Sequence, residues 1–438
     1  MRKVDNIIIG AGPGGYELAA GLAARGESTC IIERDSLGGT CLNRGCIPTK
    51  CLAASAEAYQ NAVGAYRYGV VAKVDGIDYS AVSDRMNEVV TDLRMGVAGL
   101  LGAAEVISGE AALIPERGVV VNGEEIYARR RLVIATGSKP MLPSVGGIGL
   151  AMTSDDVLRM TVLPESAIII GGGVIGLEFA SILSSFGVDT SVIEYCKEIL
   201  PPFDPDMAKR LRMILNRRGV TFKTGCKVES IAKTDVGVAV TYSGKKGPET
   251  AEASVAVCAV GRRPVVPEGL DAAGVETDIR GFIAVNEKME TSADGVYAIG
   301  DVNGLSMLAH SAVAQGKVVL GHEDAFDRRA IPSVVFTNPE IAMCGLSEAH
   351  LQAEGTGYRT VKRQFASLGK ACAIGQTEGL AKFLVSANDG RILGATVLGP
   401  HASDLIAEAT ILIRDGRSLE DASTRYIHAH PTLSEIFA

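Results

Sequence analysis

Residues 7–17 read IIIGAGPGGYE, an apolar run that passes into a glycine-rich turn. Residues 168–178 read IIIGGGVIGLE and repeat this pattern with a constant offset of 161 residues. In each copy a carboxylate follows 18 residues after the third glycine, at the end of a second apolar strand: Glu33 and Glu194. We therefore predict one strand–turn–helix–strand unit that is used twice.

The glycines of both turns suit the binding of a dinucleotide. They permit a tight turn, the close approach of a pyrophosphate and close helix–strand packing, while the helix N-terminus offers free N–H groups and the distal acid accepts a ribose hydroxyl. One such turn is weak evidence, but two in register indicate two Rossmann-like sites. An acid at position 194 favours NAD over NADP, although the cation of Lys197 is close by. The glycines are Gly10, Gly12 and Gly15, and Gly171, Gly173 and Gly176.

The order of patterns along the chain predicts an α/β fold with three domains. We assign residues 1–140 and 266–327 to a first dinucleotide-binding domain, 141–265 to a second, and 328–438 to a C-terminal α+β domain. Within the first, a helical insertion is expected near residues 53–101, short strands around 105–113 and 119–127, and a returning strand at 296–299. Strands at 333–336, 381–385 and 392–398 and a helix at 403–414 are expected in the third.

Composition narrows the class of protein. The 438 residues are 47% hydrophobic with 51 glycines, as in a glycine-rich α/β protein with large cores. The net charge of −8 argues against nucleic acid or an anionic membrane as a general partner. Nine scattered cysteines favour a reducing compartment, and neither a leader peptide nor an apolar run of about 18 residues is evident. We expect a cytoplasmic protein.

Residues 39–50, GTCLNRGCIPTK, hold two cysteines, Cys41 and Cys46. Five helical steps rise about 7.5 Å, whereas the Cα atoms of a disulfide lie within about 7 Å of each other. A regular helix would resist the bond, but Gly45 permits local distortion, and a strained, accessible disulfide is the labile kind. The spacing alone leaves open a redox pair or two unrelated thiols.

Motifs along the whole chain make it similar to the flavin-dependent pyridine nucleotide–disulfide oxidoreductases. They are the two glycine turns, the cysteine pair and residues 135–138, 261–264, 297–301, 307–310, 336–340 and 428–435. Within that family the chain most resembles the dihydrolipoamide dehydrogenases. The resemblance implies FAD in the first site and NAD in the second, no metal, a homodimer built by the C-terminal domain, and a lipoyl-bearing protein of a 2-oxo acid dehydrogenase or glycine cleavage system as the partner.

The resemblance also assigns the catalytic roles. Cys41 exchanges with the substrate sulfur and Cys46 lies against the flavin, while the other cysteines pack as small apolar residues. His430 is the base, since deprotonation of a dithiol near neutral pH suits an imidazole, and Glu435 orients it. His428 supports this site, which His430 enters from the partner chain. Without the resemblance, a histidine near a glutamate close to the C-terminus would more often be an exposed pair with no catalytic role.

Further positions are implied as cofactor contacts. Lys50 and Glu178 pair beside the flavin, where a cation stabilises negative charge on the reduced ring; each is also consistent with an ordinary helix-surface charge. Asp301 contacts the ribityl chain of FAD. The remaining contacts to FAD or NAD are expected at Ala111, Gly137, Ala309, Val228 and Gly261.

Two other functions remain open at this point. A sibling disulfide reductase driven by NADPH is disfavoured by Glu194 and by the motif at residues 428–435. A non-catalytic flavoprotein subunit is disfavoured because Cys41, Cys46 and His430 are all present.

Overall fold

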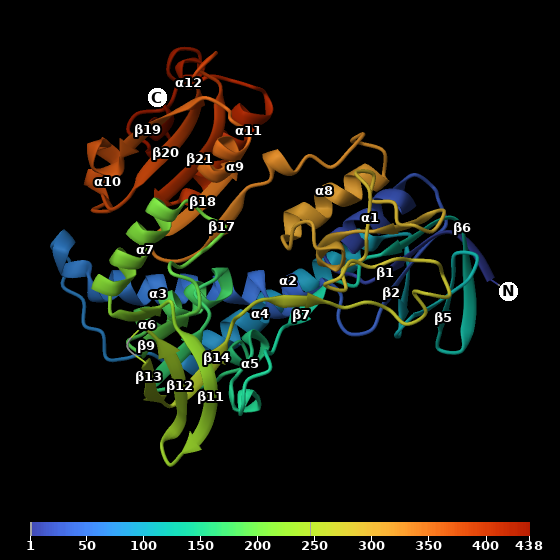
Figure 1. The fold of residues 1–438 in the computed structure, drawn as a ribbon, viewed down its shortest axis with the longest axis horizontal. Helices are drawn as coiled ribbons and strands as arrows, with labels where there is room; N and C mark the ends of the chain where they lie inside the picture. The colour runs from blue at the N-terminus through green and yellow to red at the C-terminus, as the bar shows by residue number, and fades with distance from the viewer. Residues whose placement is uncertain (1, 246) are drawn as a thin grey trace. The chain divides into compact units, whose positions relative to one another are not determined.

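The structure, a computed structural model, describes residues 2–245 and 247–438, which form two compact units (Figure 1). The first comprises the chain up to Cys51 together with Ser80–Met141 and Gly261–Phe326. The second comprises Leu52–Tyr79, Leu142–Val260 and Asp327–Ala438. The chain thus leaves the first unit and returns to it twice, and the second return falls slightly before the predicted residue 266.

The first unit is built on a seven-stranded sheet in the order β3-β2-β1-β6-β5-β4, with β16 also paired to β6. Strands β3, β2, β1, β6 and β16 are parallel, whereas β4 and β5 are antiparallel to their neighbours. The strands are β1 Arg2–Ile9, β2 Thr29–Glu33, β3 Glu105–Ser108, β4 Ala112–Ile114, β5 Gly118–Val121, β6 Glu124–Ile134 and β16 Val296–Ala298. A small ribbon pairs β7 Ser138–Pro140 with β15 Arg262–Pro264.

Two helices position the first glycine turn. Helix α1 (Pro13–Ala24) starts directly after it, and α8 (Ala309–Val319) packs against α1 (Figure 1). A Cβ built on Gly14 would lie 3.0 Å from the Cβ and the carbonyl oxygen of Ala312, so glycine is favoured where the two helices approach each other. Helix α2 (Gly39–Arg44) carries the next part of the predicted site.

The helical insertion is two long helices rather than one stretch. Helix α3 (Cys46–Val63) is followed by a 3₁₀ turn η1 (Ala65–Tyr68), and α4 (Tyr79–Leu101) follows after a segment without regular structure. Strand β6 also differs from the prediction, because it runs as one strand of 11 residues past the end of the short strand expected around residues 119–127. Its first half pairs with β5 and its last residues pair with β16.

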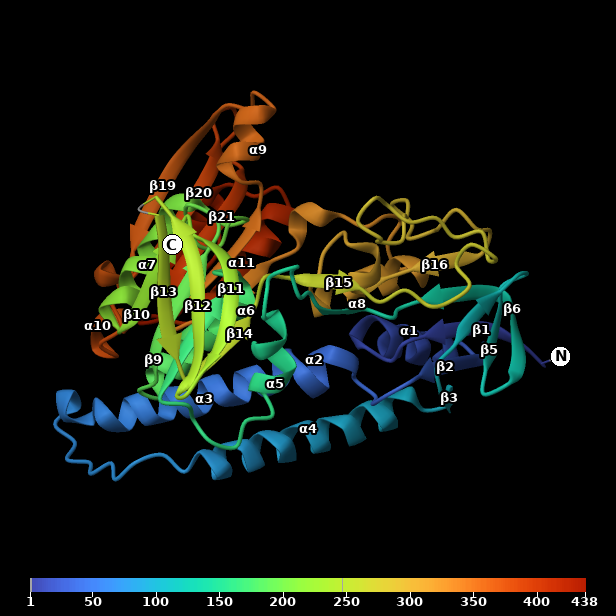
Figure 2. The same cartoon turned by 60° about the horizontal axis from the view of Figure 1, so that its bottom comes forward.

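The second unit repeats the parallel βαβ arrangement. Its four-stranded sheet has the order β10-β9-β8-β14, from β8 Ser166–Ile170, β9 Asp189–Glu194, β10 Val220–Thr224 and β14 Val255–Cys258. The helices are α5 Ser154–Val157, α6 Val174–Ser185 and α7 Pro205–Arg217. An antiparallel ribbon that was not predicted follows: β11 Lys227–Thr234, β12 Gly237–Gly244 and β13 Gly247–Ala253 (Figure 2).

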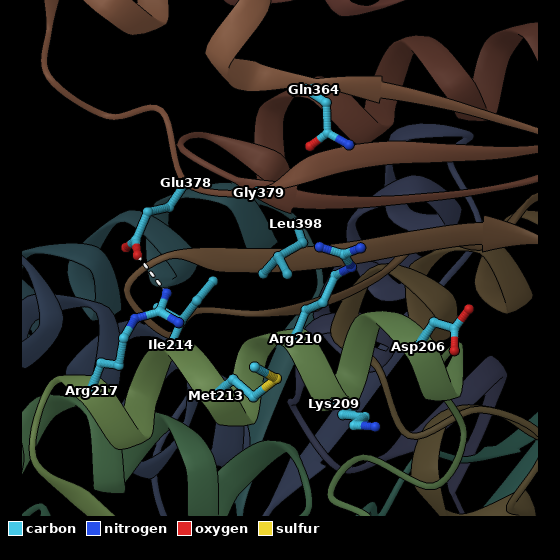
Figure 3. Close-up of a pocket in the computed structure, with 10 residues that line it drawn as sticks. All are labelled: Asp206, Lys209, Arg210, Met213, Ile214, Arg217, Gln364, Glu378, Gly379 and Leu398. Carbon is cyan, nitrogen blue, oxygen red and sulfur yellow. Dashed lines mark hydrogen bonds and ion pairs between the residues drawn. The ribbon is translucent and has the colours of Figure 1, made fainter.

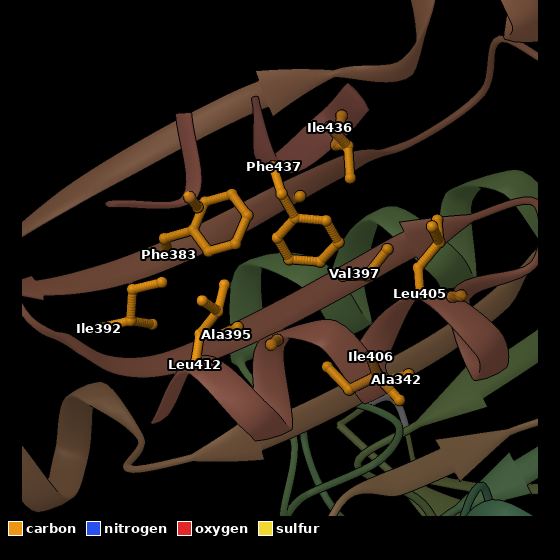
Figure 4. Packing of buried hydrophobic residues seen from close by; sticks show 14 of the residues in the cluster. Ala342, Phe383, Ile392, Ala395, Val397, Leu405, Ile406, Leu412, Ile436 and Phe437 are labelled. Carbon is orange, nitrogen blue, oxygen red and sulfur yellow. The ribbon is translucent and has the colours of Figure 1, made fainter. Parts of the chain in front are cut away.

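The C-terminal part of the second unit is an antiparallel sheet in the order β17-β18-β21-β20-β19. Its strands are β17 Ser333–Val335, β18 Glu340–Gly345, β19 Tyr358–Gln364, β20 Leu380–Ser386 and β21 Ile392–Gly399. Helix α11 (Ala402–Arg414) covers one face, and its apolar side chains meet Phe383 and Phe437 in a buried core (Figure 4). Shorter helices are α9 Glu348–Ala353, α10 Gly369–Ala373 and α12 Leu419–Thr424. The α/β fold class with an α+β C-terminal part is confirmed.

Candidate active site

The two glycine turns have nearly the same backbone. Gly10 and Gly171 have φ values of 103° and 108°, in the region that favours glycine. A Cβ on Gly10 would lie 2.4 Å from the carbonyl oxygen of Ala135, and one on Gly171 would lie 2.6 Å from that of Ala259. In both copies, therefore, the first glycine lets the turn pass against the neighbouring strand.

The distal acids are used in the same way in both copies. Glu33 accepts hydrogen bonds from the backbone N–H groups of Ala11, at 2.7 Å, and of Asp35, at 2.9 Å. Glu194 accepts from the N–H of Gly172 and from that of Cys196, at 2.6 Å. Each carboxylate is thereby fixed beside its glycine turn, at the carboxyl end of its strand, where a ribose would meet it.

Both turns also suit a pyrophosphate. A Cβ built on Gly12 or on Gly173 meets no described atom within 4 Å, so the backbone at each helix start borders open space. Helices α1 and α6 begin at these residues, and neither has a side-chain cap. Their first N–H groups and the helix dipole are available to an anion. The residues present fit two dinucleotides.

The predicted distortion between the cysteines is confirmed. Helix α2 ends at Arg44, Gly45 has φ −149° and ψ −114°, and α3 begins at Cys46. A Cβ on Gly45 would lie 2.8 Å from the carbonyl oxygen of Thr40, so glycine is required at the break. The interruption brings the two thiols together, although a continuous helix would have kept them apart.

The thiols of Cys41 and Cys46 lie close to each other. A hydrogen bond with Cys46 and burial raise the pKa of the Cys41 thiol, and the charge of Lys50 opposes this shift. Cys41 is half-buried and Cys46 is exposed. The exposure of the two side chains within one chain therefore does not tell which cysteine exchanges with the substrate and which lies against the flavin. These two roles stay a prediction.

One residue that the sequence did not single out braces this segment. The side-chain nitrogen of Asn43 donates to the carbonyl oxygens of Gly39, at 2.9 Å, and Leu37, at 3.0 Å. Its Oδ1 accepts from Nε and Nη2 of Arg94 in α4, at 3.0 and 2.7 Å. These bonds fix α2, and with it Cys41, from within the first unit.

Asp301 lies in a small polar network at the ends of β6 and β16. Ser138 donates to its carboxylate, and Arg262 donates to Oγ and to the carbonyl oxygen of Ser138, both at 2.7 Å. Burial raises the pKa of Asp301, and Ser138 and Arg262 oppose that shift. Ser138 and Arg262 were not selected from the sequence as site residues, although each directly follows a glycine, Gly137 or Gly261, that was selected as a cofactor contact.

The other predicted contacts occupy separate places. Ala111 is buried between β3 and β4, and Ala309 is the first residue of α8. Gly137 and Gly261 have positive φ and lie next to the β7–β15 ribbon in the first unit. Val228 is half-buried in β11 of the second unit. Their contacts to FAD or NAD stay predictions.

Glu178 is buried in α6, and Oε1 of its carboxylate accepts the N–H of Phe336 at 3.0 Å. Lys50 belongs to the first unit and Glu178 to the second, so their pairing stays a prediction.

His430 and Glu435 come together as predicted. Nδ1 of His430 lies 2.9 Å from Oε1 of Glu435, whose Oε2 accepts the N–H of Thr432 at 2.9 Å. The hydrogen bonds from His430 and Thr432 lower the pKa of Glu435. The imidazole itself is 77% exposed within one chain. A carboxylate on Nδ1 leaves Nε2 as the nitrogen that is able to take a proton.

His428 differs from His430 in its surroundings. Its side chain is 8% exposed, and Nε2 lies 2.8 Å from Oε1 of Glu408 in α11. This contact anchors the segment that leads to His430, whose peptide bond to Pro431 is cis.

Within the described residues, no group of three or more His, Cys, Asp or Glu side chains is arranged to hold a metal ion. None of the helices that the structure describes is both long and apolar enough to cross a membrane.

Comparison with known proteins supports this interpretation. A family model described as pyridine nucleotide-disulphide oxidoreductase matches residues 4–316, and a model of the dimerisation domain of the same family matches residues 331–438. Dihydrolipoyl dehydrogenase of Geobacillus stearothermophilus is 38% identical over 99% of this chain and 94% of its own length. The protein of that name from Chlamydia muridarum is 40% identical over 99% of this chain and 95% of its own.

Solved structures show the same fold over the whole chain. LpdA from Mycobacterium tuberculosis superposes with a TM-score of 0.90 at 26% identity, covering 99% of this chain and 98% of its own. The HOCl-induced flavoprotein disulfide reductase RclA from Escherichia coli superposes with a TM-score of 0.88 at 28% identity, covering 99% of this chain and 98% of its own.

Proposed function

The chain belongs to the pyridine nucleotide–disulphide oxidoreductase family, and from this premise we propose that it oxidises dihydrolipoamide to lipoamide with reduction of NAD⁺. The dihydrolipoamide would be carried by a lipoyl-bearing protein of a 2-oxo acid dehydrogenase or glycine cleavage system. Relatives named dihydrolipoyl dehydrogenase, matched over nearly the full length, support this substrate.

The side chains of Cys41, Cys46 and His430 account for the sulfur chemistry. With Cys41 and Cys46 oxidised to a disulfide, His430 takes a proton from one substrate thiol, and the thiolate attacks Sγ of Cys41. The bond between Cys41 and Cys46 breaks, and Cys46 leaves as a thiolate. The second substrate sulfur then displaces Cys41, so that the substrate closes its own disulfide and the enzyme holds the reduced pair.

The two dinucleotide sites would hold the cofactors. The turn at Gly10–Gly15 with Glu33, together with Asp301, would hold FAD, and the turn at Gly171–Gly176 with Glu194 would hold NAD. The flavin supplies the transfer of two electrons between the cysteine pair and the nicotinamide. A fixed carboxylate at Glu194 favours the free 2′-hydroxyl of NAD, because a 2′-phosphate would be repelled.

The match to a dimerisation domain supports a homodimer. The C-terminal domain carries large apolar side chains that are exposed within one chain, and Ile427, at 100%, directly precedes His428. Ile411 at 61% and Tyr426 at 43% belong to the same domain. We propose that a second copy covers these side chains and receives His430 at its cysteine pair.

The observation that carries this proposal is the break at Gly45, which places two thiols together just after a dinucleotide turn. Steady-state assays should compare dihydrolipoamide with NAD⁺ or NADP⁺, and glutathione disulfide with NADH or NADPH. We expect turnover with dihydrolipoamide and NAD⁺, and a loss of at least about 10³-fold in Cys41→Ser with flavin retained. Turnover with glutathione disulfide and NADPH alone would instead support a sibling disulfide reductase.

A further inference from the structure

Lys382 stands in the middle of β20, a strand in which every residue is buried. Its side chain is only 3% exposed, which is unusual for a lysine, and no role was assigned to it from the sequence. A buried ammonium group is unfavourable unless carboxylates compensate it. The carboxylates that compensate Lys382 therefore identify the elements that this strand is bonded to.

Two carboxylates accept hydrogen bonds from the ammonium group of Lys382, and Oδ2 of Asp206 lies 4.0 Å from it. Nζ donates to Oδ2 of Asp204, which is itself 8% exposed, and to Oε2 of Glu348 in α9 at 2.8 Å. The other oxygen of Asp204, Oδ1, accepts the N–H of Met207 at 3.1 Å and so caps α7. One side chain thus joins the start of α7 to the C-terminal sheet.

Asp204 ends the segment that begins at Glu194, the acid of the second dinucleotide turn. Within that segment the N–H of Leu200 donates to the carbonyl oxygen of Gly172 at 3.0 Å, and the N–H of Phe203 donates to that of Leu200 at 2.8 Å. Residues 194–204 are consequently held at one end by β9 and the glycine turn, and at the other by the bond between Asp204 and Lys382.

The far end of α7 is attached in a different way. Arg217 and Arg218 each contact Glu378 at 2.8 Å, with side chains that are 41–59% exposed. Between the two ends, α7 borders a groove of about 470 Å³ that includes Met213 and Leu398 (Figure 3). Exposed ion pairs contribute little, so the buried cluster at Asp204 is the stronger of these two charged attachments of the helix.

We propose that Lys382 is a positioning residue for the second dinucleotide site, acting through Asp204 on residues 194–204. The inference rests on the proposed function, in which that site takes NAD⁺. The C-terminal domain would then serve the nucleotide as well as the dimer, because it fixes the segment that follows the ribose-binding acid.

The test is the double substitution Lys382→Met with Asp204→Asn in the full-length holoenzyme. It removes the two most buried charges together and leaves only Glu348, which is 30% exposed, without its cation, whereas Lys382→Met alone would also leave the buried Asp204 uncompensated. Asparagine at position 204 still caps the helix. We expect KM and Kd for NAD⁺ to rise about tenfold, as when a binding segment is misplaced. We expect kcat to stay within about twofold, and the rate at which dihydrolipoamide reduces the enzyme in stopped flow to stay unchanged.

Three companion variants make the result decisive. Glu378→Gln breaks the exposed contact at the other end of α7 and should leave KM for NAD⁺ unchanged. Asp204→Asn alone keeps the cap and weakens only the contact with Lys382, so it gives the answer if the double variant does not fold; KM is expected to rise in it too, by a smaller factor. Lys382→Arg keeps the charge and should restore most of the affinity.

An unchanged KM for NAD⁺ in the folded variants would overturn the role of Lys382. So would a fall in the rate of the dihydrolipoamide half-reaction by the same factor as the rise in KM. Glu194→Gln separates this from a failure of the proposed function. If Glu194→Gln raises KM and the variants at Lys382 and Asp204 do not, only the positioning role is wrong. If Glu194→Gln also has no effect, the assignment of NAD⁺ to the second site is wrong.

Discussion

The two glycine turns of this chain have nearly the same backbone but different surroundings. After each acid the chain returns to its glycine turn. In the first copy the N–H of Gly38 donates to the carbonyl oxygen of Ala11 at 2.8 Å, and in the second the N–H of Leu200 donates to that of Gly172 at 3.0 Å. Both returning residues have positive φ. Beyond this point the copies diverge, because the first continues into the cysteine pair and the second into α7, which Lys382 fixes.

The first turn is also more tightly enclosed. A Cβ on Gly39 would lie 2.7 Å from the Cα of Gly12, and α8 presses Ala312 against Gly14. In the second turn the position that corresponds to Gly14 is occupied by Ile175, whose side chain is half-buried. We interpret the enclosed turn as suited to a resident flavin and the more open one as suited to a nucleotide that binds and leaves in each cycle.

The largest effect should come from the first glycine of each turn. In Gly10→Ala and Gly171→Ala a methyl group meets a backbone carbonyl oxygen at 2.4 or 2.6 Å with a positive φ, which should cost about 3 kcal/mol of stability in each. Gly10→Ala should lose flavin on gel filtration, whereas Gly171→Ala should keep flavin and lose turnover with NAD⁺. Equal loss of flavin from both would contradict the division of roles.

The next effect concerns the two acids. The two carboxylate oxygens of Glu194 accept one N–H group each, and Glu194→Gln leaves a single carbonyl oxygen for both. KM for NAD⁺ should therefore rise about tenfold, and the preference of the enzyme for NAD⁺ over NADP⁺ should become smaller. Glu33→Gln should leave KM for NAD⁺ within about twofold and weaken retention of flavin instead. Steady-state kinetics and the flavin absorbance after dialysis measure both. A change in KM from Glu33→Gln would contradict the assignment of the first site to FAD.

A third comparison tests the returning residues. Leu200 has φ 48° and is 1% exposed, so Leu200→Gly relieves about 1 kcal/mol of backbone strain but removes a buried side chain worth about 3 kcal/mol. We expect a net loss of about 2 kcal/mol in denaturant unfolding. If the variant is more stable than the parent, backbone strain outweighs packing at this position.

The smallest effect is expected at the position where the first copy has Gly14 and the second has Ile175. Gly14→Ala brings its methyl group to 3.0 Å from Ala312, and α8 has to shift by a few tenths of an ångström, so we expect a loss of about 1 kcal/mol and faster release of flavin. Ile175→Ala, the matched change in the other copy, should leave flavin release as it is. Thermal unfolding and the rate of flavin loss in dilute protein distinguish the two.

The fold was predictable from the sequence where the requirement is local. In each copy the glycine turn, the distal acid and the apolar strands lie within about thirty residues of one another. Between the two cysteines, Gly45 indicates that the helix is interrupted. The ribbon β11–β13 was missed because its outer residues are polar and its alternation is weak.

The remaining parts of the site depend on contacts between distant residues. Ser138 meets Arg262 and Asp301 only after the chain has passed through the whole second nucleotide domain. Lys382 is likewise 178 positions from Asp204, and the local signal is a lysine in a strand that is apolar apart from Ser386 at its end. Such pairings follow from topology, which a pattern read along the chain does not contain.

The interleaving of the first unit has a consequence for protein synthesis. The last residues of β6 pair with β1 on one side, but their partner on the other side is β16, which emerges from the ribosome after the entire βαβ segment at residues 142–260. Until then an edge containing the buried residues Leu132, Val133 and Ile134 stays unpaired, and α1 lacks α8. The inserted nucleotide domain has all its parallel strands earlier, so on the ribosome the later copy of the duplication is the first able to complete its sheet.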